Sequence, residues 1–320
     1  MKRHFTRLTM FALLLILLPV RALAAVRLVP VGQVIGLQLY NDTVTVAAYD
    51  DVLGGAAKAA GLKIGDRILK INDMSIASAE DVRSALNCGE GTLNLTVSRG
   101  GKQRELTLTP TQTKDGPRMG VYLRQGIAGI GTVTWYDPDT GAFGALGHGV
   151  CDSGGILKMT RGSAYDASVT EVKKGKSGDP GQLKGTARSL EPIAPLLRNT
   201  AQGVFGVTAR GWRGEALPVA EYAQIHTGPA TIRAQTSDRV QEYSVEILKI
   251  YPQTRTDCRN FLLKVTDPEL LRATGGIVQG MSGSPILQDG QLIGAVTHVL
   301  VNDPTAGYGI YIQNMLNAAA

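Results

Sequence analysis

The chain has 320 residues, of which 43% are hydrophobic and 19% are charged, and this composition excludes a largely disordered protein. The net charge is +6, but four of the basic residues precede residue 25, where no acidic residue occurs. No later stretch gathers Lys and Arg with interleaved aromatic residues, so nucleic-acid binding is excluded as well. The 39 glycines, the 5% aromatic content and short runs of Val, Ile and Thr favour a mainly β fold, and the length favours two domains.

The first 24 residues have the pattern of an export signal. Basic residues stand at the start, an apolar run follows at 8–20, and Ala22 and Ala24 form the small-x-small pattern of a cleavage site. The apolar run is shorter than the ~20 residues that a membrane-spanning helix needs. We therefore expect residues 1–24 to be a signal peptide or an N-terminal membrane anchor, and the rest of the chain to be exported across a membrane.

Strand and helix patterns alternate between residues 27 and 111. Strands are predicted at 32–39, 43–49, within 62–72, and at 92–98 and 104–109, where two glycines at 100–101 favour a hairpin. Short helices are predicted at 55–60 and from the N-cap Ser78 to residue 86. This is the pattern of a small α+β domain.

The same region resembles a PDZ domain of the bacterial protease type, in the segments GLQL at 36–39, AGLKIGD at 60–66 and IN at 71–72. The resemblance implies a permuted PDZ domain over residues 27–111, in which the ligand-binding strand comes first. Gly36 and Leu37 would offer backbone N–H groups to a peptide carboxylate. The strand that continues through Gln38 and Leu39 would accept an added strand from a partner. The alternative is a domain that docks on its own chain and binds no other ligand.

A polar linker at 111–118 leads into a second region of short strands, residues 118–320. Strands are predicted at 119–123, 131–136, 203–208, 230–234, 243–251, 261–266 and 292–299, and short helices at 268–273 and 312–319. Closely spaced strands with glycine turns are typical of a β-barrel or a sandwich.

The segment GGIVQGMSGSPI at 275–286 is typical of the nucleophile loop of chymotrypsin-like peptidases, with Ser282 as the nucleophile. Gly280 allows a backbone turn in which its own N–H and that of Ser282 can point at one oxyanion. Gly283 leaves space beside the hydroxyl, and Pro285 fixes the exit into the next strand. The alternative is an ordinary Gly/Ser turn.

A serine nucleophile needs a base, and only three histidines follow the export segment. His148, in the segment GALGHG, lies at the end of a strand of small residues, in a turn that leaves its ring accessible, and is the preferred base. His226 lies in a polar segment and reads as a surface imidazole. His298 lies within a strand and reads as a packed residue or a residue of the substrate groove.

An aspartate is expected to orient the base. Asp267 follows a strand and precedes a short helix, so that its alternative role is to cap that helix. Asp152 is a rival, because it lies four residues after His148. Asp257, Asp289 and Asp303 read as solvated turn residues.

Taken together, these segments resemble the SpoIVB peptidases, the stage IV sporulation serine peptidases of endospore-forming bacteria. The resemblance rests on GALGHG around His148, KVTDPELL around Asp267, GGIVQGMSGSPI around Ser282 and the segment IGAVTHVLVNDPTAGYGI at 293–310. It covers nearly the whole chain in order and implies a catalytic triad of His148, Asp267 and Ser282.

The resemblance also implies a signalling role. The protein would be secreted from the forespore into the space between the forespore and mother-cell membranes. There it would cleave itself and a regulatory subunit of an intramembrane protease, and so release sigma-factor processing. One departure from this pattern is the short segment between the export signal and the PDZ strands, which leaves little linker for self-cleavage.

Two other functions fit parts of the pattern. One is a catalytically silent module in which the PDZ domain binds peptides, and the other is a quality-control protease, although such proteases usually carry the PDZ domain after the peptidase. We expect no metal or other cofactor, because Cys88, Cys151 and Cys258 are widely separated and lack metal-ligand spacing. The sequence leaves open whether any two of them pair.

Overall fold

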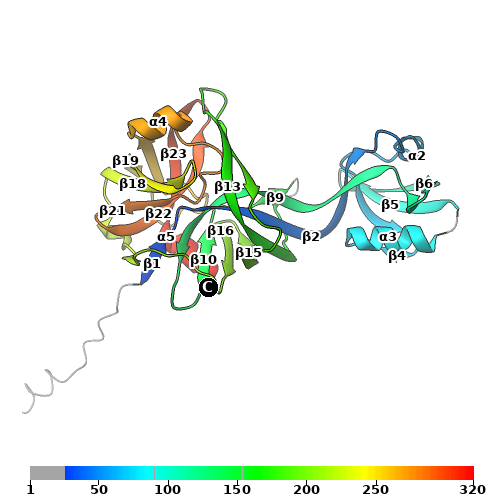
Figure 1. The fold of residues 1–320 in the computed structure, drawn as a ribbon, viewed down its shortest axis with the longest axis horizontal. Coiled ribbons are helices and arrows are strands. Elements are labelled where there is room, and N and C mark those ends of the chain that lie inside the picture. Colours follow the sequence, from blue (N-terminus) through cyan, green and yellow to red (C-terminus); the bar gives the residue numbers. More distant parts are fainter. Residues whose placement is uncertain (1–25, 90, 153–154) are drawn as a thin grey trace, which may run out of the picture.

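The computed structural model describes residues 26–89, 91–152 and 155–320. The predicted export segment, residues 1–24, lies outside the described residues. Within those ranges, no helix is long and apolar enough to cross a membrane. The described chain forms two closed β-barrels and a smaller lobe joined to the first barrel by two long strands (Figure 1). The predicted mainly β fold, a small α+β unit with a barrel-containing peptidase region, is confirmed.

Six strands close the first barrel. They pair in the order β9–β10–β16–β15–β13–β2, and β2 returns to β9. The strands are β2 (Val34–Tyr49), β9 (Val121–Tyr136), β10 (Ala142–Ala145), β13 (Arg161–Lys173), β15 (Ala194–Thr200) and β16 (Gly203–Val207). Shorter strands flank them: β1 (Arg27–Pro30), β11 (Cys151–Asp152), β12 (Gly155–Ile156), β14 (Gln182–Ala187) and β17 (Leu217–Pro218). Alternate side chains of β2 and β9 point inward and pack on Phe143 of β10, which is fully buried.

Six other strands close the second barrel, paired in the order β18–β19–β20–β23–β22–β21. These are β18 (Gly228–Gln235), β19 (Val240–Ile250), β20 (Phe261–Val265), β21 (Pro285–Gln288), β22 (Gln291–Leu300) and β23 (Asp303–Tyr311). The helices η1 (Tyr222–Gln224), α4 (Pro268–Thr274) and α5 (Ile312–Ala319) accompany this barrel, and the last two are where the sequence predicts them. Leu263, Phe261 and Ile286 form part of its core.

The smaller lobe has the strands β3 (Arg67–Ile71), β4 (Met74–Ser75), β5 (Leu93–Arg99), β6 (Lys102–Leu108), β7 (Thr111–Thr113) and β8 (Gly116–Arg118). Its helices are α2 (Gly55–Ala59) and α3 (Ala79–Cys88). The predicted cap of α3 is present: the Ser78 side chain accepts a hydrogen bond from the Asp81 N–H, and Asp81 accepts in return from the Ser78 N–H. The lobe has a core of its own, around Ile68, Leu93 and Leu95.

Two strands run unbroken from this lobe into the first barrel. In the barrel Leu39 pairs with Ile127, and in the lobe Val44 pairs with Gln125. Between these pairs β2 bulges outward, and Gly126 of β9 takes a left-handed conformation with φ of +86°. A Cβ at Gly126 would lie 1.9 Å from the Leu39 carbonyl oxygen, so this position requires glycine. The lobe is therefore an insertion between two paired strands of the barrel.

This arrangement corrects the predicted domain boundary at residue 27. The sequence suggests two separate strands at 32–39 and 43–49, both within a PDZ domain that ends at residue 111. Instead they form the single strand β2, whose first half, with β1, packs in the first barrel through Val29, Ile35 and Leu37. Local patterning does not reveal this, because the partners of the first half of β2 lie about a hundred residues further along the chain.

The predicted PDZ peptide-binding residues also need correction. Gly36, Leu37, Gln38 and Leu39 lie between two strands: Gly36 pairs with Ile130 of β9 and with Tyr165 of β13, and the other three are paired on both sides too. Their backbone groups are used in the barrel, so the prediction that they accept an added peptide strand is wrong. Within the lobe, β9 pairs only with β2, which leaves the other edge of residues 121–125 unpaired among the described strands.

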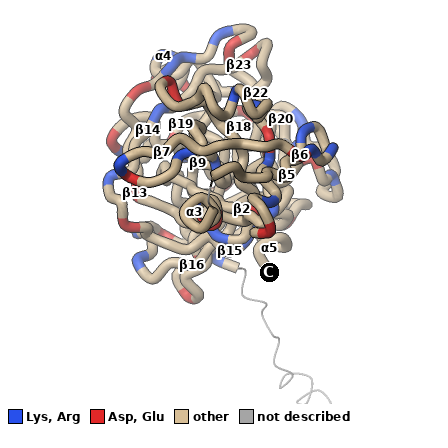
Figure 2. The backbone as a smooth tube through the Cα atoms, turned by 90° about the vertical axis from the view of Figure 1, so that its right-hand side faces the viewer, with Lys and Arg blue, Asp and Glu red and all other residues tan. Residues whose placement is uncertain are grey.

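Charged residues are spread over the molecule. On the face shown in Figure 2, Lys and Arg are interspersed with Asp and Glu along the backbone.

The shared strands predict opposite outcomes for two deletions. Replacing residues 40–126 by a short glycine-containing turn should leave a soluble protein that unfolds cooperatively, because Leu39 and Ile127 already face each other. Deleting residues 27–111 removes β1 and β2, opens the first barrel and should give an aggregated or unfolded product. Circular dichroism melts and size-exclusion chromatography measure both. Cooperative unfolding after the second deletion would contradict the shared barrel.

Candidate active site

The two barrels enclose a cavity of about 560 Å³, and both barrels contribute to its lining. His148 reaches it from the turn after β10, in the first barrel. Gly280 and Ser282 reach it from the loop between α4 and β21, in the second. Of the residues predicted to be catalytic or to form the oxyanion hole, the structure thus brings His148, Gly280 and Ser282 together.

The backbone of the nucleophile loop depends on two glycines, Gly280 and Gly283, which both have φ of +98°. A Cβ on Gly283 would lie 2.1 Å from the Thr132 carbonyl oxygen, so no larger residue fits there. Thr132 of β9 holds the loop from the first barrel: its N–H donates to the Ser282 carbonyl (3.1 Å), and its hydroxyl donates to the Gly280 carbonyl (2.9 Å). The strand β9 therefore fixes the position of the serine.

With the Gly280 and Ser282 carbonyls turned toward Thr132, the N–H groups of the same two residues are left available. Within the described ranges, neither N–H donates a hydrogen bond. Two backbone donors separated by one residue, without partners beside a serine hydroxyl, suit the binding of an oxyanion.

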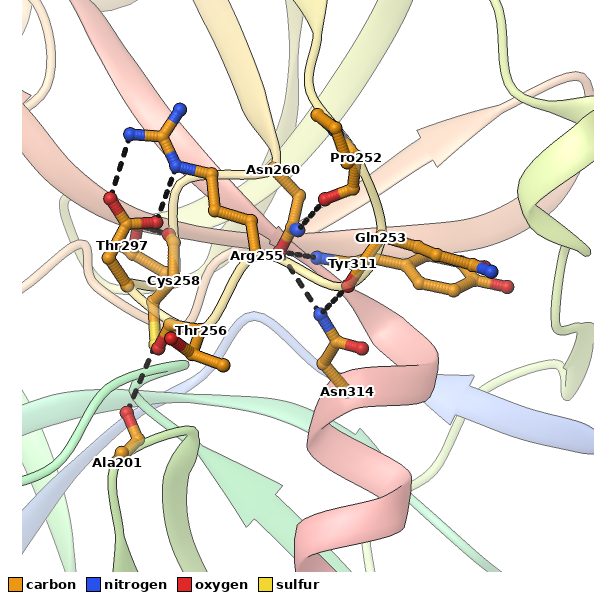
Figure 3. A network of polar contacts seen from close by, with 11 residues as sticks. Ala201, Pro252, Gln253, Arg255, Thr256, Cys258, Asn260, Thr297, Tyr311 and Asn314 are labelled. Atoms are coloured by element: carbon orange, nitrogen blue, oxygen red, sulfur yellow. Dashed lines mark hydrogen bonds and ion pairs between the residues drawn. The ribbon is translucent and has the colours of Figure 1, made fainter.

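The Ser282 hydroxyl donates to the Thr297 carbonyl at an O···O distance of 2.8 Å. Thr297 is held in turn by its own hydroxyl, which donates to the Cys258 carbonyl (2.8 Å, Figure 3). Cys258 has a φ of +59°, unusual for a side chain other than glycine, and its thiol donates to the Ala201 carbonyl (3.0 Å). Burial raises the pKa of this thiol to about 11, so it stays protonated. Within the described chain all three cysteines are free thiols.

His148 lies in a strained turn, half-buried, after Leu146 and Gly147, which have φ of +71° and +69°. Its Nδ1 is 3.0 Å from the Gly149 carbonyl oxygen. Since a carbonyl can only accept, Nδ1 carries the proton and Nε2 has the free lone pair. Burial lowers the pKa of His148, against the opposing effect of the Gly149 hydrogen bond. The ring is therefore neutral at pH 7, as a general base must be.

A second imidazole, His298 of β22, lies beside the ring of His148. The two ring centroids are 5.3 Å apart with 38° between the ring planes, and both rings line the cavity. Burial is the main cause that lowers the pKa of His298 to about 4, with His148 and Arg259 adding to it. The sequence reading of His298 as a groove residue is consistent with this position. His226, in contrast, is an exposed residue whose Nε2 is 2.8 Å from an Asp289 carboxylate oxygen.

Asp267 is not part of this cavity. Its carboxylate caps α4, accepting from the N–H groups of Glu269 (2.9 Å) and Leu270 (3.0 Å), and it also accepts from Ser244 N–H (3.3 Å). Among the described residues, neither Asp267 nor either of its chain neighbours lines the cavity. The structure thus contradicts the predicted contact between Asp267 and His148 and shows the capping role instead.

Among the described residues that line the cavity, none is an Asp or Glu. Asp257 lies near the cavity end of β20 and acts electrostatically on His298, but its carboxylate holds the Arg255 guanidinium at 2.7 and 2.8 Å. Asp152, the rival acid, lies exposed in β11. The group that orients His148 here is the Gly149 carbonyl, a backbone acceptor that side-chain patterns in a sequence do not reveal.

The described residues contain no group of three or more His, Cys, Asp or Glu side chains that could hold a metal ion.

Comparison with known proteins gives matches over both parts of the chain. The model of the SpoIVB peptidase family, S55, matches residues 115–316, and that of the PDZ domain matches residues 33–109. A protein of Agrobacterium fabrum whose name describes it as a zinc metalloprotease is 33% identical over 114 residues, 33% of this chain and 29% of that protein. The mitochondrial serine protease HTRA2 of Drosophila willistoni is 38% identical over 65 residues, 20% of this chain and 15% of its own. The match thus covers under a third of each of these relatives.

A solved structure, the active form of the Rv3671c protease from M. tuberculosis, aligns with 62% of this chain and 75% of its own, at 13% identity and a TM-score of 0.33. The family model covers more than half of the chain and contains both Ser282 and His148. The chain therefore belongs to the SpoIVB peptidase family S55, with a PDZ domain before its peptidase region.

Proposed function

We propose that the protein is a serine endopeptidase in which Ser282 is the nucleophile and His148 the general base. The observation that carries this proposal is the shared cavity. The Ser282 hydroxyl, the neutral imidazole of His148 and the two backbone N–H groups without partners all meet in it, from both barrels. Membership of a peptidase family supports the same function.

In the proposed reaction the Ser282 hydroxyl turns from the Thr297 carbonyl to Nε2 of His148 when a peptide binds. Its oxygen then attacks the peptide carbonyl carbon, and its proton passes to Nε2. The carbonyl oxygen becomes an oxyanion that the Gly280 and Ser282 N–H groups bind. Nε2 gives the proton to the leaving amine, and water later resolves the acyl-enzyme by the same route in reverse.

The Gly149 carbonyl keeps the proton of His148 on Nδ1 and so fixes the required tautomer. A neutral carbonyl stabilises the imidazolium less than a carboxylate would, because the hydrogen bond lacks the charge of the acceptor. The proposed site therefore works as a serine–histidine pair whose base is oriented by backbone.

The signalling function rests on the family. We propose that the exported protein cleaves itself and a regulator of an intramembrane protease, in the space between the forespore and mother-cell membranes. Incubating wild-type protein and Ser282→Ala with each other tests self-cleavage, because wild-type enzyme should cut the inactive variant at the same bond that it cuts in itself.

Reaction with a fluorophosphonate distinguishes a serine peptidase from a catalytically silent PDZ module. A fluorophosphonate should label wild-type protein on Ser282, because only an activated serine reacts, and Ser282→Ala should lose the label and all peptide cleavage. The variant should keep its melting temperature, since the hydroxyl makes a single hydrogen bond. Ser284→Ala is the matched control. Labelling that survives in Ser282→Ala would refute the assignment, and no labelling of the wild type would favour the binding module.

The structure shows Asp267 as a helix cap, whereas the family resemblance implies that it is the triad acid. Substitution of Asp267 distinguishes these two roles. As a helix cap, Asp267→Ala should cost about 1 kcal/mol of stability, and Asp267→Asn less, because Asn also caps. Both should keep kcat within about tenfold of wild type. Urea denaturation and steady-state kinetics provide the two readouts. A loss in kcat of about 10⁴ in Asp267→Asn, the effect expected of a triad acid, would show that Asp267 reaches His148 during catalysis.

The pH dependence follows from the buried base. Because burial lowers the pKa of His148 below the ordinary 6.5, and the base acts in its neutral form, kcat/KM should fall only below pH 6.5 as the pH decreases. His298→Ala opens the site to water and should move the pH at which kcat/KM falls up toward 6.5. His298→Phe keeps the site buried and should leave that pH low. A fall of kcat/KM that already begins above pH 7 in the wild type would contradict the buried, carboxylate-free environment of His148.

A further inference from the structure

The cavity wall is mainly aliphatic. Within the described chain, its lining contains no Lys, Arg, Asp or Glu. The first barrel contributes Leu39, Ile127 and Ile130, and the second contributes Ile277, Val278 and Val299. Apart from the catalytic groups, therefore, a bound peptide meets mainly aliphatic side chains on both sides of Ser282.

This wall is close to the reacting bond in sequence as well as in space. Ile277 and Val278 belong to the nucleophile loop itself and are each 2% exposed. Val299 follows two residues after Thr297, whose carbonyl accepts from the Ser282 hydroxyl. On the opposite side, Ile130 precedes Thr132 of β9 by two residues and lies 3.3 Å from where a Cβ of Gly280 would be. Side chains that flank the scissile bond must therefore contact aliphatic groups.

Two charged groups near His298, Asp257 and Arg259, have contacts of their own, although the buried Nε of Arg259 makes no hydrogen bond within the described chain. Asp257 holds the Arg255 guanidinium through two hydrogen bonds. The Arg259 guanidinium lies 5.1 Å from the centre of the Tyr308 ring. The lining offers a charged substrate side chain no counter-ion in place of the water that it would lose, and such a desolvated charge is unfavourable.

From this lining we infer the substrate class of the proposed peptidase: extended protein segments with aliphatic, uncharged residues on both sides of the cleaved bond. This inference rests on the proposed function and adds to it the class of peptide bond that the enzyme cleaves. It makes Val299 and Ile130, two half-buried members of the wall, residues that determine which bond is cut.

The test uses full-length protein and matched peptides that differ only at the two residues around the bond. With Leu, Val or Ile there, kcat/KM should exceed that for Lys, Arg, Asp or Glu by on the order of 100-fold. Val299→Asp places a carboxylate in the wall. This variant should raise kcat/KM for the Lys and Arg peptides, relative to kcat/KM for the aliphatic peptides, by about tenfold or more. Val52→Asp, which changes an 88% exposed valine in the PDZ lobe, is the matched control and should leave the profile unchanged.

Fluorophosphonate labelling of Ser282 tests the peptidase assignment separately from the substrate class. Labelling without a preference for aliphatic residues, or with charged residues preferred, would overturn the substrate class and leave the peptidase assignment standing. Wild-type protein without labelling would remove the peptidase assignment, and the substrate class with it. If Val299→Asp fails to fold, Val301→Asp, at a 53% exposed position of the same lining, carries the same expectation.

Discussion

The pairing of β2 with β9 is the constraint on which the rest of the molecule depends. The two strands pair through both lobes, from Tyr49 with Val121 at one end to Val34 with Thr132 at the other. They close the first barrel, connect it to the PDZ lobe and line the cavity. Thr132 of β9 also holds the carbonyls of Gly280 and Ser282. The position of Ser282 is therefore set by a strand that begins in the PDZ lobe.

The chemistry of the site follows from its position between two barrels. Each barrel contributes one half of the proposed site: the first contributes His148, and the second contributes Ser282 and the N–H groups of Gly280 and Ser282. Backbone groups replace side chains in the supporting roles, since the carbonyls of Gly149 and Thr297 orient the base and the nucleophile. Such groups cannot titrate, so in this arrangement His148 alone among the proposed catalytic groups changes charge near neutral pH.

What the sequence revealed depended on how local each signal is. The loop around Ser282, the turn around His148 and the cap at Ser78 are short patterns whose geometry their own residues enforce, and the structure has them where they were expected. The role of residues 34–39 was mistaken because their partners, β9 and β13, come from distant parts of the chain. Asp267 fits both the family pattern and the capping pattern, and only its hydrogen bonds to the N–H groups of Glu269 and Leu270 in the folded chain distinguish the two roles. His298 lies in the middle of a strand, so that its neighbour His148 could be identified only in three dimensions.

The most direct test of the account is an experimental structure of the protein after reaction with a peptidyl phosphonate that carries Leu at the position next to phosphorus. We expect a bond from phosphorus to Ser282 Oγ and a phosphoryl oxygen ~2.7–3.1 Å from the N–H nitrogens of Gly280 and Ser282. The Leu side chain should lie against the aliphatic wall. We also expect that His148 Nδ1 still donates to the Gly149 carbonyl. A phosphoryl oxygen turned away from the two N–H groups, or a carboxylate on Nδ1 of His148, would contradict the account.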